Sequence, residues 1–172
     1  MEEALLLKRA KNGDLEAYKH IIDHYSPLVE RFAFQIGTPY KSISDVSQEV
    51  FIRIYRTLPQ FSQTTFTTWL YTMTYKTVKE YVEQALYEEE QECENPIFLH
   101  EEDKMLHECI GGLDEIYRLP IILFCFHDQS YEEISDILKI SVSTVKTRVT
   151  KAKSLLKQSI IQKEQEAGVY DG

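Results

Sequence analysis

Apolar side chains recur three to four residues apart along most of the chain, which is the spacing of one face of an α-helix. In the first half, this pattern predicts helices at about residues 2–11, 14–37, 44–58 and 65–87. No stretch alternates apolar and polar residues on either side of an Asn-Gly or Asp-Gly turn, as a β-hairpin would. The sequence therefore predicts an all-α fold.

The helical pattern is interrupted between residues 88 and 104. Glutamate dominates this stretch, Asn95-Pro96 interrupts it, and its apolar residues are confined to Ile97-Phe98-Leu99 at its end. We expect a flexible acidic linker here, between two small helical domains at residues 1–87 and 105–165. The last residues, from Glu166 on, are expected to fray.

The C-terminal domain carries the signature of a helix-turn-helix at residues 130–151. Ser130 and Glu133 have the spacing of a capping box, and Ser141 can cap a second helix after the tight turn Lys139-Ile140-Ser141. The first helix is expected to bury Ile134, Ile137 and Leu138. The second is expected to bury a stripe formed by Val145, Val149, Ala152 and Leu156.

Charge makes this second helix a candidate for reading DNA. The net charge of -9 argues against a nucleic-acid partner, but residues 141–163 contain six basic side chains and no acidic one. Arg148 can pair bidentately with guanine, while lysines and hydroxyls suit phosphates. We predict that the helix enters the major groove of DNA and contacts it through Ser143, Thr144, Lys146, Thr147, Arg148 and Lys151.

The third predicted helix has an apolar face, formed by Val46, Val50, Phe51, Ile54 and Leu58, and an outer face that is mostly charged. An apolar Ile52 among charged residues favours a protein interface, although a solvated face with one exposed apolar residue explains the pattern equally well. The candidate interface residues are Asp45, Gln48, Glu49, Ile52, Arg53, Tyr55 and Arg56.

The fourth predicted helix combines aromatic residues with lysines. It is expected to bury Phe66, Leu70, Met73, Thr77 and Tyr81, with the single tryptophan, Trp69, at the edge. The opposite face would then present Thr68, Tyr71, Thr72, Tyr75, Lys76 and Lys79. Aromatic rings can stack on unpaired bases while ammonium groups hold phosphates, so this face suits a single strand; exposed tyrosines also pack against proteins.

Three segments resemble extracytoplasmic-function sigma factors, the promoter-specificity subunits of bacterial RNA polymerase in the sigma-70 family. They are Asp45-Val46-Ser47-Gln48-Glu49-Val50-Phe51, Phe66-Thr67-Thr68-Trp69-Leu70-Tyr71, and the helix-turn-helix with Tyr131-Glu132-Glu133-Ile134-Ser135, Thr144-Val145-Lys146-Thr147-Arg148 and Lys151-Ala152-Lys153, preceded by Leu113 and Arg118. The resemblance spans about residues 5–156.

The resemblance implies a role for each surface. The third helix would dock on the clamp helices of the polymerase's largest subunit, the fourth would melt and read the minus-10 element, and the helix-turn-helix would read the minus-35 element. The two domains would then be sigma regions 2 and 4. The family also implies a membrane-associated anti-sigma factor, a stress or envelope response, and a monomer when the protein is free.

The chain departs from the family pattern at several positions. Asp114 replaces a proline and Ser135 replaces an alanine, both mild changes. On the fourth helix, Tyr75-Lys76 stands where Arg-Asn is usual, and Glu83 and Gln84 stand where the family has arginines. Either the minus-10 contacts are weaker and depend on Lys76 and Lys79, or the preferred promoter differs; the sequence leaves both open.

Other classes of function find less support in the sequence. No apolar run approaches the roughly 20 residues of a membrane span, and Met1-Glu2-Glu3 does not resemble a signal peptide, so we expect a cytoplasmic protein. No phosphate loop or nucleophile elbow is present, so neither an enzyme nor a cofactor is expected. His20 and His24 lack a third metal ligand. Cys93, Cys109 and Cys125 lie 16 residues apart, which favours reduced thiols over a metal clip.

Two questions remain open at this point. A dimeric repressor or activator would use the same helix-turn-helix on a palindromic site without polymerase. The acidic linker, with nine acidic side chains and one lysine in residues 85–112, fits a mimic of nucleic acid inside the polymerase channel or a solvated tether.

Overall fold

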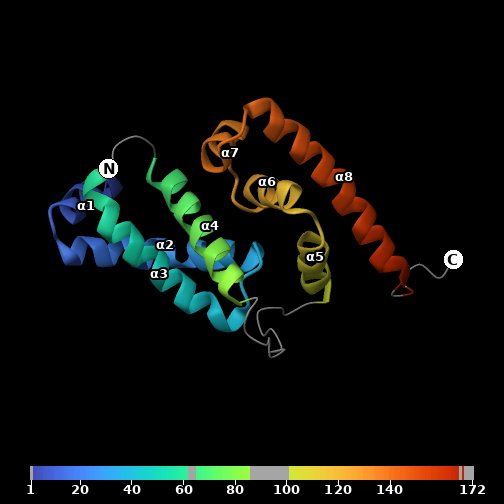
Figure 1. Cartoon of the computed structure of the whole chain (residues 1–172), viewed down its shortest axis with the longest axis horizontal. Helices are drawn as coiled ribbons and strands as arrows, with labels where there is room; N and C mark the ends of the chain where they lie inside the picture. Colours follow the sequence, from blue (N-terminus) through green and yellow to red (C-terminus); the bar gives the residue numbers. More distant parts are fainter. Residues whose placement is uncertain (1, 62–64, 86–100, 167, 169–172) are drawn as a thin grey trace. The chain divides into compact units, whose positions relative to one another are not determined.

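The computed structural model describes residues 2–61, 65–85, 101–166 and 168, and these are helical with no strand among them. The chain divides into two compact units, Met1–Gln91 and Glu92–Gly172 (Figure 1). The all-α prediction is therefore confirmed. Among the described helices, none has the length and hydropathy that a bilayer span needs.

Unit 1 contains helices α1 (Glu2–Lys11), α2 (Leu15–Gln35), α3 (Ile43–Thr57) and α4 (Phe66–Ala85), with 3₁₀ turns at Tyr40–Ser42 and Leu58–Gln60 on either side of α3. Helix α2 contacts α1, α3 and α4, so the core forms around it (Figure 1). Among its fully buried side chains are Val29, Phe32, Val46, Ile54 and Leu70. The five apolar residues predicted for the inner face of α3 are all buried, as expected.

The start of α2 is set by its N-cap, Asp14. The Asp14 carboxylate accepts a hydrogen bond from the backbone N–H of Ala17 at 3.2 Å. It also forms an ion pair with Arg9 at 2.7 Å. The Ala17 hydrogen bond, followed by Arg9, lowers the pKa of Asp14. Gly13 lies in the turn between α1 and α2 and has a φ of 91°, a backbone conformation that residues with a Cβ atom rarely adopt.

Unit 2 contains α5 (Glu101–Gly111), α6 (Glu115–Phe126), α7 (Tyr131–Leu138) and the long α8 (Val142–Glu166), which contacts the other three. Its core joins Ile121, Ile122 and Leu123 of α6 to Ile134 of α7 and Val145 of α8. Further along α8, Lys163 forms an ion pair with Glu108 of α5 at 3.0 Å. Helix α8 is thus anchored along its length, while one of its faces remains available.

The predicted linker extends too far at its C-terminal end. Residues 86–100 lie outside the described part of the chain, but α5 begins at Glu101, so the expectation that residues 101–104 belong to the linker is wrong. Acidic side chains such as Asp103 interact favourably with the positive end of a helix dipole. An acidic stretch can therefore open a helix as well as form a tether.

Candidate polymerase and nucleic-acid interfaces

The start of the helix-turn-helix is fixed by a complete capping box. The Ser130 hydroxyl accepts from the backbone N–H of Glu133 at 3.0 Å, and the Glu133 carboxylate accepts from the backbone N–H of Ser130 at 3.2 Å. This satisfies two backbone donors that the first turn of α7 would otherwise leave without a partner. The predicted cap is confirmed.

The turn between α7 and α8 is held by local hydrogen bonds. Lys139 adopts the left-handed conformation (φ 58°, ψ 44°) and its N–H donates to the carbonyl of Ser135. The Ser135 hydroxyl donates to the carbonyl of Ile140, a bond that the alanine usual at this position could not make. Ser141 then accepts from the N–H of Thr144 at 3.2 Å, which confirms the second cap.

Five of the six predicted DNA-contacting residues line one groove in unit 2. The groove has a volume of about 420 Å³ and lies between α8 and the first turn of α6, and it is lined by Ser143, Thr144, Thr147, Arg148 and Lys151 together with Ile116 and Tyr117. The predicted inner residues Val145, Val149 and Ala152 are buried, while Leu156 and Leu138 are half-buried. Sequence reasoning missed Ile116 and Tyr117 because only the tertiary packing brings α6 beside this face.

The sixth predicted residue, Lys146, flanks the groove instead of lining it. Its ammonium lies 5.8 Å from the ring centroid of Tyr131, and Lys153 lies 4.6 Å from that of Phe124. The two rings stack on each other, with centroids 5.1 Å apart and 7° between their planes. Lys146 is exposed, so its ammonium is still accessible to a phosphate.

In unit 1, α2 and α3 form a larger groove of about 590 Å³. From α3 it is lined by the predicted interface residues Gln48, Ile52, Tyr55 and Arg56, and from α2 by Leu15, Tyr18, Ile22, Ser26 and Glu30. Leu15 is 65% exposed, Tyr55 40% and Ile52 39%, so apolar surface is open to solvent here. Sequence reasoning missed the α2 wall; the apolar Leu15 directly after a capping residue was the available signal.

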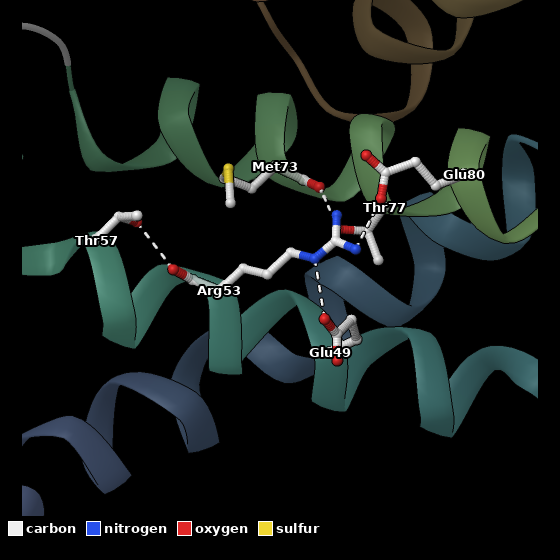
Figure 2. Close-up of polar contacts among 6 residues, drawn as sticks. All are labelled: Glu49, Arg53, Thr57, Met73, Thr77 and Glu80. Atoms are coloured by element: carbon white, nitrogen blue, oxygen red, sulfur yellow. Dashed lines mark hydrogen bonds and ion pairs between the residues drawn. The ribbon is translucent and has the colours of Figure 1, made fainter.

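Arg53 was expected on the same outer face, but its guanidinium turns toward α4 (Figure 2). Nε donates to Glu49 at 3.0 Å, one terminal nitrogen lies 2.7 Å from the carboxylate of Glu80, and the other donates to the hydroxyl of Thr77 at 3.4 Å. Glu80, and then Glu49, raise the pKa of Arg53. Arg53 therefore bridges α3 to α4, and it does not line the α2–α3 groove.

The predicted faces of α4 need a correction. Thr68 is 4% exposed and Tyr71 is 1% exposed, so the expectation that these two residues lie on the open face is wrong. Tyr71 packs edge-on against Phe32 of α2, with ring centroids 5.0 Å apart. Thr74 and Val78 are buried, whereas Met73 and Tyr81, which were expected in the core, are half-buried.

Threonine accounts for part of this error, because Thr68 and Thr74 were not expected in the core, whereas the buried Thr77 was. The hydroxyl of Thr74 donates to the carbonyl of Leu70 at 2.7 Å, and that of Thr77 donates to the carbonyl of Met73 at 2.8 Å. A threonine whose hydroxyl bonds to the preceding turn of its own helix can enter the core without losing a hydrogen bond. Polarity therefore does not mark the outer face of α4.

The face of α4 that remains open is smaller than predicted, and it carries two lysines as well as the exposed Glu80 and Glu83. Lys76 and Lys79 are exposed, Thr72 and Tyr75 are half-buried, and the Lys79 ammonium lies 5.8 Å from the Tyr75 ring centroid. At the start of α4, Trp69 stacks on Phe61, with ring centroids 4.7 Å apart and 10° between the planes. Phe61 was not foreseen, because it precedes the helix and has no place in its periodicity.

No group of three or more His, Cys, Asp or Glu side chains suited to a metal ion is present in the described residues. Cys109 is a buried free thiol and Cys125 an exposed one, and desolvation raises the pKa of Cys125. Cys93 lies outside the described residues.

Comparison with known proteins agrees with both units. Residues 21–85 match the family model for sigma-70 region 2, and residues 103–156 match that for sigma-70 region 4. The ECF RNA polymerase sigma-E factor of Haemophilus influenzae is 27% identical to this chain, with 93% of the chain and 96% of the relative covered. The sigma-E factor of Escherichia coli K12 is 28% identical, with 93% and 95% covered.

Two solved structures have the same fold. One is CnrH in complex with the cytosolic domain of CnrY, with a TM-score of 0.74, 20% identity, and coverage of 92% of this chain and 96% of that one. The other is the sigma factor RpoE in complex with the anti-sigma factor NepR from Bartonella quintana, with a TM-score of 0.69, 18% identity, and coverage of 83% and 96%.

The two family models together match well over half of the chain, one in each unit. The relatives are matched over nearly their whole length. Sigma factors are initiation factors and not enzymes, in agreement with the expectation from the sequence. The chain belongs to the sigma-70 family, as an extracytoplasmic-function sigma factor.

Proposed function

We propose that this sigma factor directs promoter-specific transcription initiation by dividing the work among three helical surfaces. The α2–α3 groove binds the polymerase core, the open face of α4 holds the melted minus-10 strand, and α8 reads the minus-35 duplex. We assign residues 1–87 to sigma region 2 and residues from Glu101 on to sigma region 4, with the acidic stretch between them as the linker.

The α6–α8 groove is the observation that carries the proposal. One wall is α8, which has no acidic side chain up to residue 163, and the lining gathers one arginine, one lysine and three serine or threonine hydroxyls around a concave surface. Arg148 can distinguish guanine by about 1–3 kcal/mol through its two parallel donors. Lys151 and the hydroxyls are suited to phosphates, which position the helix but do not read the sequence.

The α2–α3 groove has the composition of a protein interface. Its exposed apolar side chains Leu15, Ile52 and Tyr55 are surrounded by the polar Gln48, Glu30 and Arg56. Apolar centres with polar rims are typical of specific protein interfaces. The resemblance to the family points to the clamp helices of the largest polymerase subunit as the partner.

The minus-10 contacts are proposed for a revised set of residues. Thr72, Tyr75, Lys76 and Lys79 remain candidates, while the buried Thr68 and Tyr71 support the helix from within. The stacked Phe61 and Trp69, both half-buried, add aromatic surface at the start of α4. A base stacked on such a ring gains about 1–3 kcal/mol.

Regulation follows from the same similarity. The two solved structures hold CnrH with the cytosolic domain of CnrY and RpoE with the anti-sigma factor NepR. An anti-sigma factor controls this protein too; we propose that it is membrane-associated and acts in a stress or envelope response. A protein that works on polymerase and promoter DNA acts in the bacterial cytoplasm, and we expect it to be a monomer when free.

Run-off transcription from a promoter library, with core polymerase and the full-length chain, tests the proposal. Transcripts should require both components, and a gel shift with the chain alone should give weak, steeply salt-dependent binding. Arg148→Ala and Lys151→Ala should reduce transcription, while Lys157→Ala, an exposed lysine of α8 outside the groove, serves as the matched control. The proposal is wrong if the chain alone binds a palindromic site as a dimer in the gel shift and core polymerase with the chain produces no transcript.

A further inference from the structure

Arg53 starts on the helix proposed to bind polymerase and ends on the helix proposed to bind DNA (Figure 2). Its guanidinium spans from Glu49 on α3 to Glu80 on α4, at 3.0 Å and 2.7 Å. The contact to Thr77 adds an anchor in the core, because Thr77 is itself buried and bonded to the carbonyl of Met73 at 2.8 Å. A single side chain thus links α3 to α4.

Glu80, the partner of Arg53 on α4, lies beside the lysines that are proposed to bind the DNA strand. Glu80 directly follows Lys79 and comes four residues after Lys76, and these are the two exposed lysines of the open α4 face. A second acid, Glu83, follows one turn later, where the family has arginines. An unpaired Glu80 carboxylate would repel nucleic-acid phosphates beside the only lysines of α4.

We propose that Arg53 is a positioning residue for the DNA strand and not a polymerase contact: it acts through Glu80, whose carboxylate it holds and neutralises from α3, so that Lys76 and Lys79 attract the opened strand. The inference rests on the proposed function of α3 and α4. The cation that neutralises Glu80 thus comes from the neighbouring helix, while α4 itself lacks the family's arginines at Glu83 and Gln84.

The test compares Arg53→Gln, Glu80→Gln and the double variant R53Q/E80Q in the full-length chain. Two quantities are measured for each protein: the affinity for core polymerase, and the permanganate reactivity of thymines in the melted region of a library-selected promoter at saturating sigma factor. Arg56→Gln is the matched control, because Arg56 is exposed on the same helix and lines the α2–α3 groove.

Arg53→Gln should keep its core affinity within about twofold of wild type and lose about two- to fivefold of promoter opening, the range for one partly exposed charge pair. R53Q/E80Q should recover most of that loss, since it leaves no unpaired carboxylate at position 80. Arg56→Gln should show the opposite profile, with weaker core binding and normal opening once the polymerase is saturated.

Three results would overturn the inference. Arg53→Gln binds core polymerase more weakly than wild type, Arg53→Gln opens the promoter as well as wild type, or the loss of opening in Arg53→Gln persists in R53Q/E80Q. Thermal melting of unit 1, monitored by the fluorescence of Trp69, checks that each variant is folded. If Arg53→Gln melts at a lower temperature than wild type, promoter opening by R53Q/E80Q is compared with opening by Glu80→Gln instead. Equal opening by these two variants supports the inference, and unequal opening overturns it. If the wild-type chain opens no promoter, the proposed function itself has failed, and this outcome is distinct from the other three.

Discussion

The rings of Phe124 and Tyr131 stack nearly parallel and join the end of α6 to the start of α7. Lys153 and Lys146 of α8 each extend an ammonium over one ring of this pair. Because they are seven residues apart, close to two helical turns, both lie on the same side of α8. The stacked pair therefore lies beside the face of α8 that carries Lys146 and Lys153.

Replacing Tyr131 with leucine should destabilise unit 2 beyond the loss of apolar area. The stacked pair contributes about 0.5–1.5 kcal/mol and an exposed cation–π contact about 0.5–1 kcal/mol. Urea denaturation followed by circular dichroism should show a loss of about 1–2.5 kcal/mol for Tyr131→Leu. Tyr131→Phe keeps the ring and should stay within about 0.5 kcal/mol of wild type; equal losses in both variants would contradict a role for the ring.

The capping box of α7 gives a second prediction. Ser130→Ala leaves the N–H of Glu133 without its acceptor and should lower the free energy of unfolding by about 1 kcal/mol. Ser154→Ala, at an exposed position inside α8, is the matched control and should change it by less than about 0.5 kcal/mol. The same urea titrations measure both. A cap that contributes nothing would make the two variants indistinguishable.

Two isoleucines of α3 should separate stability from binding. Ile54 is fully buried, so Ile54→Ala should cost about 2–5 kcal/mol of unfolding free energy. Ile52 lines the α2–α3 groove, so Ile52→Ala should leave the melting temperature of unit 1 nearly unchanged.

The same Ile52→Ala variant should weaken binding to core polymerase about five- to tenfold, as expected for an apolar interface residue. Ile161→Ala, an exposed isoleucine of α8, is the control and should bind core polymerase as wild type does. Normal core affinity of Ile52→Ala would argue that polymerase docks elsewhere.

Two buried tyrosines predict loss of stability in alkali. Burial, with a contribution from the carboxylate of Glu3, raises the pKa of Tyr25 to about 12, and burial also raises the pKa of Tyr18, whose hydroxyl donates to the carbonyl of Phe51. In the unfolded chain both would ionise near pH 10. The stabilisation from a raised tyrosine pKa is complete below about pH 10 and is lost as the pH rises toward 12, because only the unfolded chain gives up its proton in that window.

Tyr25→Phe should therefore show a shallower fall in unfolding free energy between about pH 10 and 12 than wild type, while the two proteins differ by a constant amount below that window. Urea titrations at a series of pH values measure this difference. Parallel curves through the whole range would show that Tyr25 ionises equally in both states.

The contrast between α3 and α4 shows what the sequence could predict. On α3 the five core residues predicted from periodicity are aliphatic or aromatic and all are buried, while the buried Ile43 and Ser47 were not foreseen. On α4 the core includes Thr68, Thr74 and Thr77, whose hydroxyls are bonded within the helix region, and a tyrosine that packs against α2. A polarity pattern cannot show which hydroxyls are satisfied, so two of the six predicted strand-binding residues proved to be buried.

Long side chains set a second limit on prediction. A helical projection gives the direction of a Cα–Cβ bond, and it placed Arg53 and Lys146 near the outer faces of their helices. Their charged groups lie several bonds beyond Cβ. The guanidinium of Arg53 contacts Glu80, and the ammonium of Lys146 lies over the Tyr131 ring. Caps involve only neighbours in sequence, and this is why those of α7 and α8 were predicted correctly.

Lys139 shows that the turn of a helix-turn-helix does not require glycine. A left-handed backbone costs a residue with a side chain about 1 kcal/mol or more, and here a lysine adopts it at the negative end of α7, where its charge is favourable. A motif search keyed to glycine in this turn would pass over this chain, whereas one keyed to the two serine caps would find it. A lysine can therefore occupy this position while the backbone keeps the left-handed turn.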